Sequence, residues 1–252
     1  MAGSPLPPHT GVSRTSIQRD HALITPESHV PVLLPGWRNT EAIVLISAEM
    51  GAKFGQLLAR CGRDAELVPL EADDELLVFV REGSVEVAFE DTSWRLSQDD
   101  YAFLAPGLDW TLRSTAGAEL LIFRKPYVPL AGTSVPESFH RSLSDVPAEP
   151  FLGDEGALLQ VLLPDHPGFD WGVNVFEFVP GGTLPQVESH FMEHGLLVLD
   201  GQGVYRLGDH WYPVQKDDCI WMGPYLPQWY VAAGKTNSRY VYYKEMNRAP
   251  EG

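Results

Sequence analysis

The chain has 252 residues, of which 44% are hydrophobic and 21% charged, so it can bury the core of one large or two small domains. Its formal net charge of -16 argues against binding to nucleic acid or to anionic membranes, because both require clustered Lys and Arg. Two cysteines, Cys61 and Cys219, are too few for a disulfide framework or a thiolate zinc site. The sequence shows no secretory signal and no apolar run of roughly 20 residues, so we expect a cytoplasmic protein.

The predicted elements are short strands, which indicates an all-β fold. Residues 1–19 begin with a Pro- and Ser-rich stretch and are expected to be a loose tail. Strands are then predicted at residues 42–48, 76–80, 85–89 and 120–124, and in the second half at residues 174–179, 195–199, 203–207 and 240–243.

The two halves of the chain repeat each other at a shift of 118 residues. Residues 77–83 fall on residues 195–201, and residues 99–106 fall on residues 217–224, with an acidic-Gly turn and an Asp-Asp turn in each half. We interpret this as an internal duplication. It predicts two tandem jelly-roll-like barrels, at residues 20–125 and 151–252, joined by a Pro-rich linker at residues 126–150.

Potential metal ligands cluster in the second repeat as Glu188-x-His190-x3-His194, followed 34 residues later by Gln228. Side chains two apart on a strand point the same way, so Glu188 and His190 project together, and His194 opens the next strand. One carboxylate, two imidazoles and an amide oxygen suit Mn²⁺ or Fe²⁺ and tolerate Zn²⁺ or Ni²⁺. The pattern resembles the metal-binding motif of cupins, with Glu, His and Gln replacing the usual His, Glu and His.

The first repeat provides an internal control. At the 118-residue shift, the four ligand positions are occupied by side chains that cannot bind a metal: Leu70, Ala72, Leu76 and Trp110. A lone His in a strand is usually structural, but four donors in this order, present in one repeat only, favour a metal site.

Three further residues are candidates for the wall of the pocket: Tyr205, Tyr240 and Lys244. Tyr240, Tyr242 and Lys244 alternate along one strand and share a face. A lysine that points into a barrel needs an anion, since a buried unpaired ammonium group is costly. The alternative is that the strand ends before Lys244 and its amine is solvated.

Several stretches resemble the (S)-ureidoglycine aminohydrolases of purine and allantoin breakdown. The resemblance extends from about Asp20 to Arg248 and is most specific in the second repeat, at residues 188–207, 211–215, 218–230 and 238–248. It implies a bicupin with one Mn²⁺ bound by Glu188, His190, His194 and Gln228. It also implies substrate contacts from Glu188, Tyr205, Gln228, Tyr240 and Lys244, of which Glu188, Tyr240 and Lys244 would be catalytic.

The implied reaction replaces the α-amino group of (S)-ureidoglycine with hydroxyl and releases ammonia. The expected partners are this small-molecule substrate and further copies of the chain, because uncovered sheet edges favour association. Two alternatives stay open at this point. One is another mononuclear-metal cupin enzyme, an oxygenase or isomerase, although Gln228 is unlike the His-rich sites of oxygenases. The other is a non-enzymatic bicupin that binds a small acid.

Overall fold

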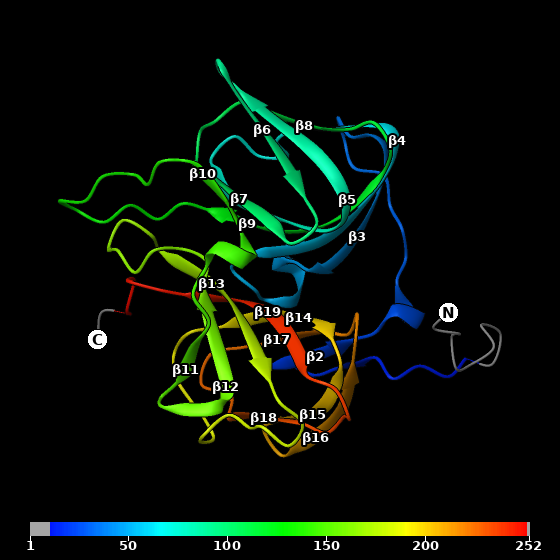
Figure 1. Ribbon diagram of the computed structural model, residues 1–252, viewed down its shortest axis with the longest axis vertical. Coiled ribbons are helices and arrows are strands. Elements are labelled where there is room, and N and C mark those ends of the chain that lie inside the picture. The colour runs from blue at the N-terminus through cyan, green and yellow to red at the C-terminus, as the bar shows by residue number, and fades with distance from the viewer. Residues whose placement is uncertain (1–10, 251–252) are drawn as a thin grey trace. The chain divides into compact units, whose positions relative to one another are not determined.

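The computed structural model describes residues 11–250, and within them the chain is almost entirely β-strand (Figure 1). The predicted all-β fold is confirmed. Helical structure in the described residues is limited to three 3-10 turns, η1 (Pro26–Ser28), η2 (Ala48–Met50) and η3 (Leu143–Asp145). None of these helices is long or apolar enough to cross a membrane.

The described residues form two compact units. The N-terminal unit contains Val30–Pro147, Val161–Gly172 and residues 245–250. The C-terminal unit contains residues 11–29, Ala148–Gln160 and Val173–Lys244. Each unit has its own hydrophobic cluster, so each unit has a separate core against which its strands pack.

The N-terminal unit is a closed barrel. A closed ring of antiparallel pairings runs through β5 (Asp74–Phe89), β8 (Trp110–Ser114), β4 (Gly55–Leu67) and β9 (Ala118–Pro126). The complete sheet contains β3 (Arg38–Ile46), β4 (Gly55–Leu67), β5 (Asp74–Phe89), β6 (Thr92–Ser97), β7 (Asp100–Leu104), β8 (Trp110–Ser114), β9 (Ala118–Pro126) and β10 (Phe139–Ser142).

The strand β5 corrects the sequence prediction, which placed separate strands at residues 76–80 and 85–89. The ladder runs through both, with a bulge between Val80 and Glu82 and a left-handed glycine, Gly83, at φ +77°. The first part of β5 pairs with β7 and β9, whereas the second part pairs with β6 and β8. The bulge therefore lets one continuous strand bend and change partners, and the local sequence shows this bend as a turn.

The C-terminal unit has two sheets. The larger contains β1 (Ser16–Ile17), β2 (His21–Ile24), β11 (Glu149–Phe151), β12 (Asp154–Val161), β13 (Trp171–Phe178), β14 (His194–Asp200), β17 (Cys219–Met222) and β19 (Ser238–Glu245). The smaller contains β15 (Gln202–Leu207), β16 (His210–Gln215) and β18 (Gln228–Ala232). Both sheets contribute to one core, with Leu196 and Phe178 from the larger sheet and Tyr205, Leu207 and Tyr230 from the smaller.

The glycine turns support the predicted duplication. Gly83 and Gly201, which are equivalent at the 118-residue shift, have φ angles of +77° and +75°. A Cβ atom on Gly83 would lie 2.4 Å from the carbonyl oxygen of Gly117, and one on Gly201 would lie 2.5 Å from that of Asn237. Each position therefore requires glycine for the same two reasons, the left-handed backbone and the close approach of another chain segment.

The compact units differ from the expected domain boundaries at the start of each repeat. β2 precedes the N-terminal barrel in sequence but pairs with β17 in the C-terminal unit. The expected linker, residues 126–150, contains β10 and η3, and β10 pairs with β7 in the N-terminal unit. The 118-residue shift places residues 21–24 on residues 139–142, so β2 and β10 are equivalent. The first strand of each repeat is thus hydrogen-bonded into the barrel built by the other repeat.

The expected loose tail also needs correction within its described part. Residues 1–10 lie outside the described residues. Within the described part of the tail, Arg14 donates two hydrogen bonds to the carboxylate of Asp218, at 2.7 and 2.8 Å. The side chain of Asp218 has no exposed area. Ser16 and Ile17 then form β1, which pairs with β2. The tail is therefore attached to the C-terminal unit from Arg14 onward.

Candidate metal and substrate site

Strand pairing in the C-terminal unit brings the predicted donors together. The backbones of Glu188 and Gln228 exchange two N–H···O hydrogen bonds, both of 2.9 Å, so the first and last donors lie directly opposite each other. His194 opens β14, where it pairs with Met222 of β17 and Lys244 of β19. Glu188 and Gln228, which are 40 positions apart in the sequence, therefore lie next to each other in the structure.

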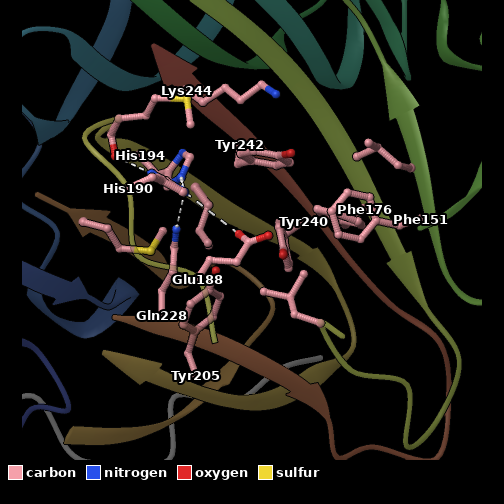
Figure 2. A pocket seen from close by; sticks show the side chains of 15 residues that line it. Phe151, Phe176, Glu188, His190, His194, Tyr205, Gln228, Tyr240, Tyr242 and Lys244 are labelled. Atoms are coloured by element: carbon pink, nitrogen blue, oxygen red, sulfur yellow. Dashed lines mark hydrogen bonds and ion pairs between the residues drawn. The ribbon is translucent and has the colours of Figure 1, made fainter. Parts of the chain in front are cut away.

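The imidazole of His190 is at the centre of this group (Figure 2). Its Nε2 atom lies 3.2 Å from Nε2 of His194 and 3.2 Å from the side-chain amide of Gln228. It is 4.0 Å from Oε2 of Glu188. Within residues 11–250, no group of three or more His, Cys, Asp and Glu side chains is drawn together closely enough to hold a metal. A metal ion bound at this point would need the side-chain amide of Gln228 as a ligand, and the carboxylate of Glu188 would have to move closer to His190.

The tautomers of the two histidines test whether the site fits a cation. Nδ1 of His194 lies 3.1 Å from the carbonyl oxygen of Tyr243, and Nδ1 of His190 lies 3.2 Å from that of Met192. A carbonyl can only accept, so both Nδ1 atoms carry a hydrogen, and in the neutral form of each ring the two Nε2 lone pairs face each other. Two lone pairs at 3.2 Å repel unless a positive charge lies beside them. The backbone carbonyls therefore orient both rings as metal ligands are oriented.

The electrostatic surroundings keep the ring of His194 and the nearby phenols neutral. Burial, followed by the charge of His190, lowers the pKa of His194 to about 3. Burial also raises the pKa of Tyr205 and of Tyr240, which are hydrogen-bonded to each other. The site thus offers the neutral imidazole of His194 as a ligand, and the neutral hydroxyls of Tyr205 and Tyr240 as hydrogen-bond donors.

A cavity of about 160 Å³ opens beside the donors. All seven residues predicted from the sequence line it: Glu188, His190, His194, Tyr205, Gln228, Tyr240 and Lys244. Figure 2 shows Phe151 and Phe176 on the side of the cavity away from His190 and His194, and Leu184 also lines the cavity. The cavity therefore suits a small molecule that presents its polar groups to one side.

Sequence reasoning missed two residues of this site. Tyr242 lines the cavity, and Asn174 of β13 donates a hydrogen bond to its hydroxyl at 3.0 Å. The alternation of Tyr240, Tyr242 and Lys244 on β19 was a usable signal for Tyr242. Asn174 gave no local signal, because its partner lies on a strand 68 residues further along the chain.

Comparison with known proteins agrees with this geometry. Residues 174–242, which carry all of the predicted ligands, match the family model described as "Cupin domain". A curated (S)-ureidoglycine aminohydrolase from Arabidopsis thaliana is 41% identical over 243 residues, covering 95% of this chain and 80% of the relative. The chain belongs to the (S)-ureidoglycine aminohydrolase family. The family member from Escherichia coli K12 is 29% identical over 235 residues, covering 91% of this chain and 90% of the relative.

The fold comparison extends over both units. The crystal structure of protein Ylba from E. coli matches with a TM-score of 0.83 and 27% identity, covering 95% of this chain and 97% of that one. The predicted cupin fold is thereby confirmed. As a member of this family, the chain is an enzyme that hydrolyses a carbon–nitrogen bond other than a peptide bond.

Proposed function

We propose that this enzyme is an Mn²⁺-dependent (S)-ureidoglycine aminohydrolase, which converts (S)-ureidoglycine and water into (S)-ureidoglycolate and ammonia in allantoin breakdown. The observation that carries the proposal is the paired Nε2 atoms of His190 and His194, 3.2 Å apart, between an amide and a carboxylate. The names of the curated relatives support the substrate.

The residues for the metal are Glu188, His190, His194 and Gln228. A set with one carboxylate, one amide and two imidazoles is harder than the His-rich sites of oxygenases and suits Mn²⁺. When bound, the ion supplies a positive charge that holds the substrate and favours departure of the amine. Glu188, with a quarter of its side chain exposed, has the freedom to close the remaining distance.

The other cavity residues bind and orient the substrate. In our proposal the ammonium group of Lys244, which lines the cavity, pairs with the substrate carboxylate. The ureido nitrogen donates its lone pair as the bond to the amino group breaks, and water then adds to the same carbon. Tyr240 or Glu188 transfers a proton at the departing or the ureido nitrogen.

Retention of stereochemistry follows from the shape of the site. The polar groups lie on one side of the cavity and the aromatic wall on the other, so water can reach the reacting carbon from a single face. We propose the same substrate-holding role for Tyr205, whose buried hydroxyl is hydrogen-bonded to Tyr240.

The decisive experiment is a coupled assay. Allantoate and a purified allantoate amidohydrolase generate ureidoglycine in place, and the Mn²⁺-loaded protein is added or withheld. We expect faster ammonia release and an enantiopure (S)-ureidoglycolate product. Release at the spontaneous rate by protein with confirmed bound metal would exclude ureidoglycine and direct the search to other small amino or hydroxy acids.

Oligomeric state and cell compartment are separate from this chemistry. A homo-oligomer and a cytoplasmic setting stay predictions from the sequence, which size measurements on the purified protein and localisation of a tagged chain can check.

A further inference from the structure

Tyr242 lies inside the cavity between two residues already proposed to bind substrate. It shares a face of β19 with Tyr240 and Lys244, and all three line the cavity (Figure 2). In the pairing of β19 with β14, Tyr242 lies opposite Leu196, and Lys244 lies opposite His194. The phenol ring is therefore next to the proposed metal ligands without being one of them.

Aromatic packing fixes the ring of Tyr242. The ring stacks on Phe176, with centroids 5.5 Å apart and planes 11° from parallel. The ring also makes edge-to-face contacts with His194 and Tyr240, whose ring centroids lie 5.7 Å and 5.9 Å from its own. Ring pairs at these separations attract each other. The position of the hydroxyl is therefore set by packing before a ligand enters.

The hydroxyl of Tyr242 is prepared to donate a hydrogen bond. Asn174, whose side chain is buried, donates to its oxygen at 3.0 Å and so occupies an acceptor position. Leaving the amide of Asn174 without this partner costs about 1–3 kcal/mol, which favours the pair. A tyrosine hydroxyl, whose ordinary pKa is about 10, carries its proton near neutral pH. That proton is left to donate elsewhere.

We propose that Tyr242, positioned by Asn174, is a further substrate-binding residue whose hydroxyl donates to the ureido carbonyl oxygen. A neutral donor stacked on Phe176 suits a neutral carbonyl, whereas the charged amine of Lys244 suits the carboxylate. Asn174 is a positioning residue, since it acts through Tyr242. This role rests on the proposed function, because the ureido group belongs to the proposed substrate.

The test is a pair of ligands measured on Mn²⁺-loaded full-length protein by calorimetry. Ureidoglycolate carries a carboxylate, a hydroxyl and a ureido group, whereas glycolate carries the carboxylate and the hydroxyl but no ureido group. Tyr242→Phe is expected to weaken ureidoglycolate binding about 3- to 10-fold, the effect of one neutral hydrogen bond, and to leave glycolate binding unchanged. Asn174→Leu is expected to weaken ureidoglycolate binding by a smaller factor than Tyr242→Phe, and to leave glycolate binding unchanged. The KM for ureidoglycine should rise more than kcat falls.

Tyr101→Phe is the matched control, because Tyr101 is a buried tyrosine of the N-terminal unit whose hydroxyl has a single partner, the carbonyl oxygen of Leu162. It should change neither affinity. Equal losses for both ligands, no loss, or loss of bound Mn²⁺ in Tyr242→Phe would each overturn the role of Tyr242. Wild-type protein that releases no ammonia would overturn the proposed function and this role together. Wild-type turnover with undiminished ureidoglycolate binding by Tyr242→Phe would overturn this role alone.

Discussion

The two barrels of this chain offer a comparison of one scaffold with and without a functional site. In the C-terminal unit, Glu188, His190, His194 and Gln228 border a cavity of about 160 Å³. In the N-terminal unit, three of the four equivalent positions border a void of about 10 Å³: Leu70, Leu76 and Trp110. A separate and more open pocket of about 740 Å³ is lined by Leu70 and Ala72, and neither Leu76 nor Trp110 reaches it. Trp110 stands where Gln228 would be and fills the space with an indole ring that is 5% exposed.

The difference teaches that the barrel does not need polar groups at these positions. Leu76 and Trp110 belong to the hydrophobic cluster of the N-terminal unit, so apolar side chains there stabilise the barrel. Polar donors at the same positions in the C-terminal unit reduce this stabilisation. We therefore infer that the donors are present for chemistry. Substitutions at these positions should impair metal binding and turnover in the C-terminal barrel, and stability in the N-terminal barrel.

The largest effect on function is expected from removing a proposed ligand. Glu188→Ala should lose bound Mn²⁺ and turnover together, since even residues that only support ligands change metal affinity by about 10- to 100-fold. Metal content by elemental analysis, measured beside the coupled assay, checks this. Full activity in the metal-depleted variant would show that the donors of the C-terminal barrel have no catalytic purpose.

The equivalent change in the N-terminal barrel should affect stability instead. Trp110→Ala leaves a cavity in a packed core and is expected to lower the free energy of unfolding by about 3–5 kcal/mol. Metal content of the folded fraction should equal that of wild type. Chemical denaturation measures the loss, and a folded variant without its metal would contradict the division of roles between the barrels.

A smaller and more selective effect is expected at Lys244. Lys244→Met should keep the metal and raise KM about 10- to 100-fold, because it removes a hydrogen bond from a charged donor to the carboxylate. Lys244→Arg, which keeps the charge, should recover part of the loss. Steady-state kinetics with metal analysis checks both variants, and metal loss in Lys244→Met would refute the assignment.

The smallest effect on function is expected at the buried carboxylate Glu75, which is equivalent to Glu193 and should act on the pH dependence of stability instead. Glu75 lies 3.3 Å from Lys125, which also pairs with Asp170. Burial, followed by Asp170, raises the pKa of Glu75 to about 9. Between its ordinary value and about 9 the folded state binds the extra proton, so stability should fall as pH rises, by at most about 1.4 kcal/mol per unit.

Glu75→Gln tests this dependence, because an amide resembles the protonated acid in shape and cannot ionise. Its free energy of unfolding should fall less between pH 6 and pH 9 than that of wild type. Denaturant titrations at the two pH values measure the difference. Equal slopes in the two proteins would mean that Glu75 is already ionised at pH 6.

Part of the site was predictable because its signal is local. Glu188, His190 and His194 lie within seven positions, and the two-residue period of a strand states which side chains share a face. Gln228 was predicted from its place after the buried strand of the repeat, and Tyr240 and Lys244 from their alternation on one strand. The family resemblance implied the same residues. The Asn174–Tyr242 pair was not found, since a single asparagine in an apolar strand does not indicate its partner.

The sequence by itself determined the all-β fold and predicted the duplication and the donors, because hydrophobic alternation, turn glycines and ligand spacing are properties of short segments. The tertiary structure alone decided that β2 pairs with β17 and β10 with β7, and that β5 is continuous through its bulge. The physical reason is that strand pairing joins segments far apart in the chain. Equivalent edges were available in both barrels, and the choice between them depends on packing that no local pattern records.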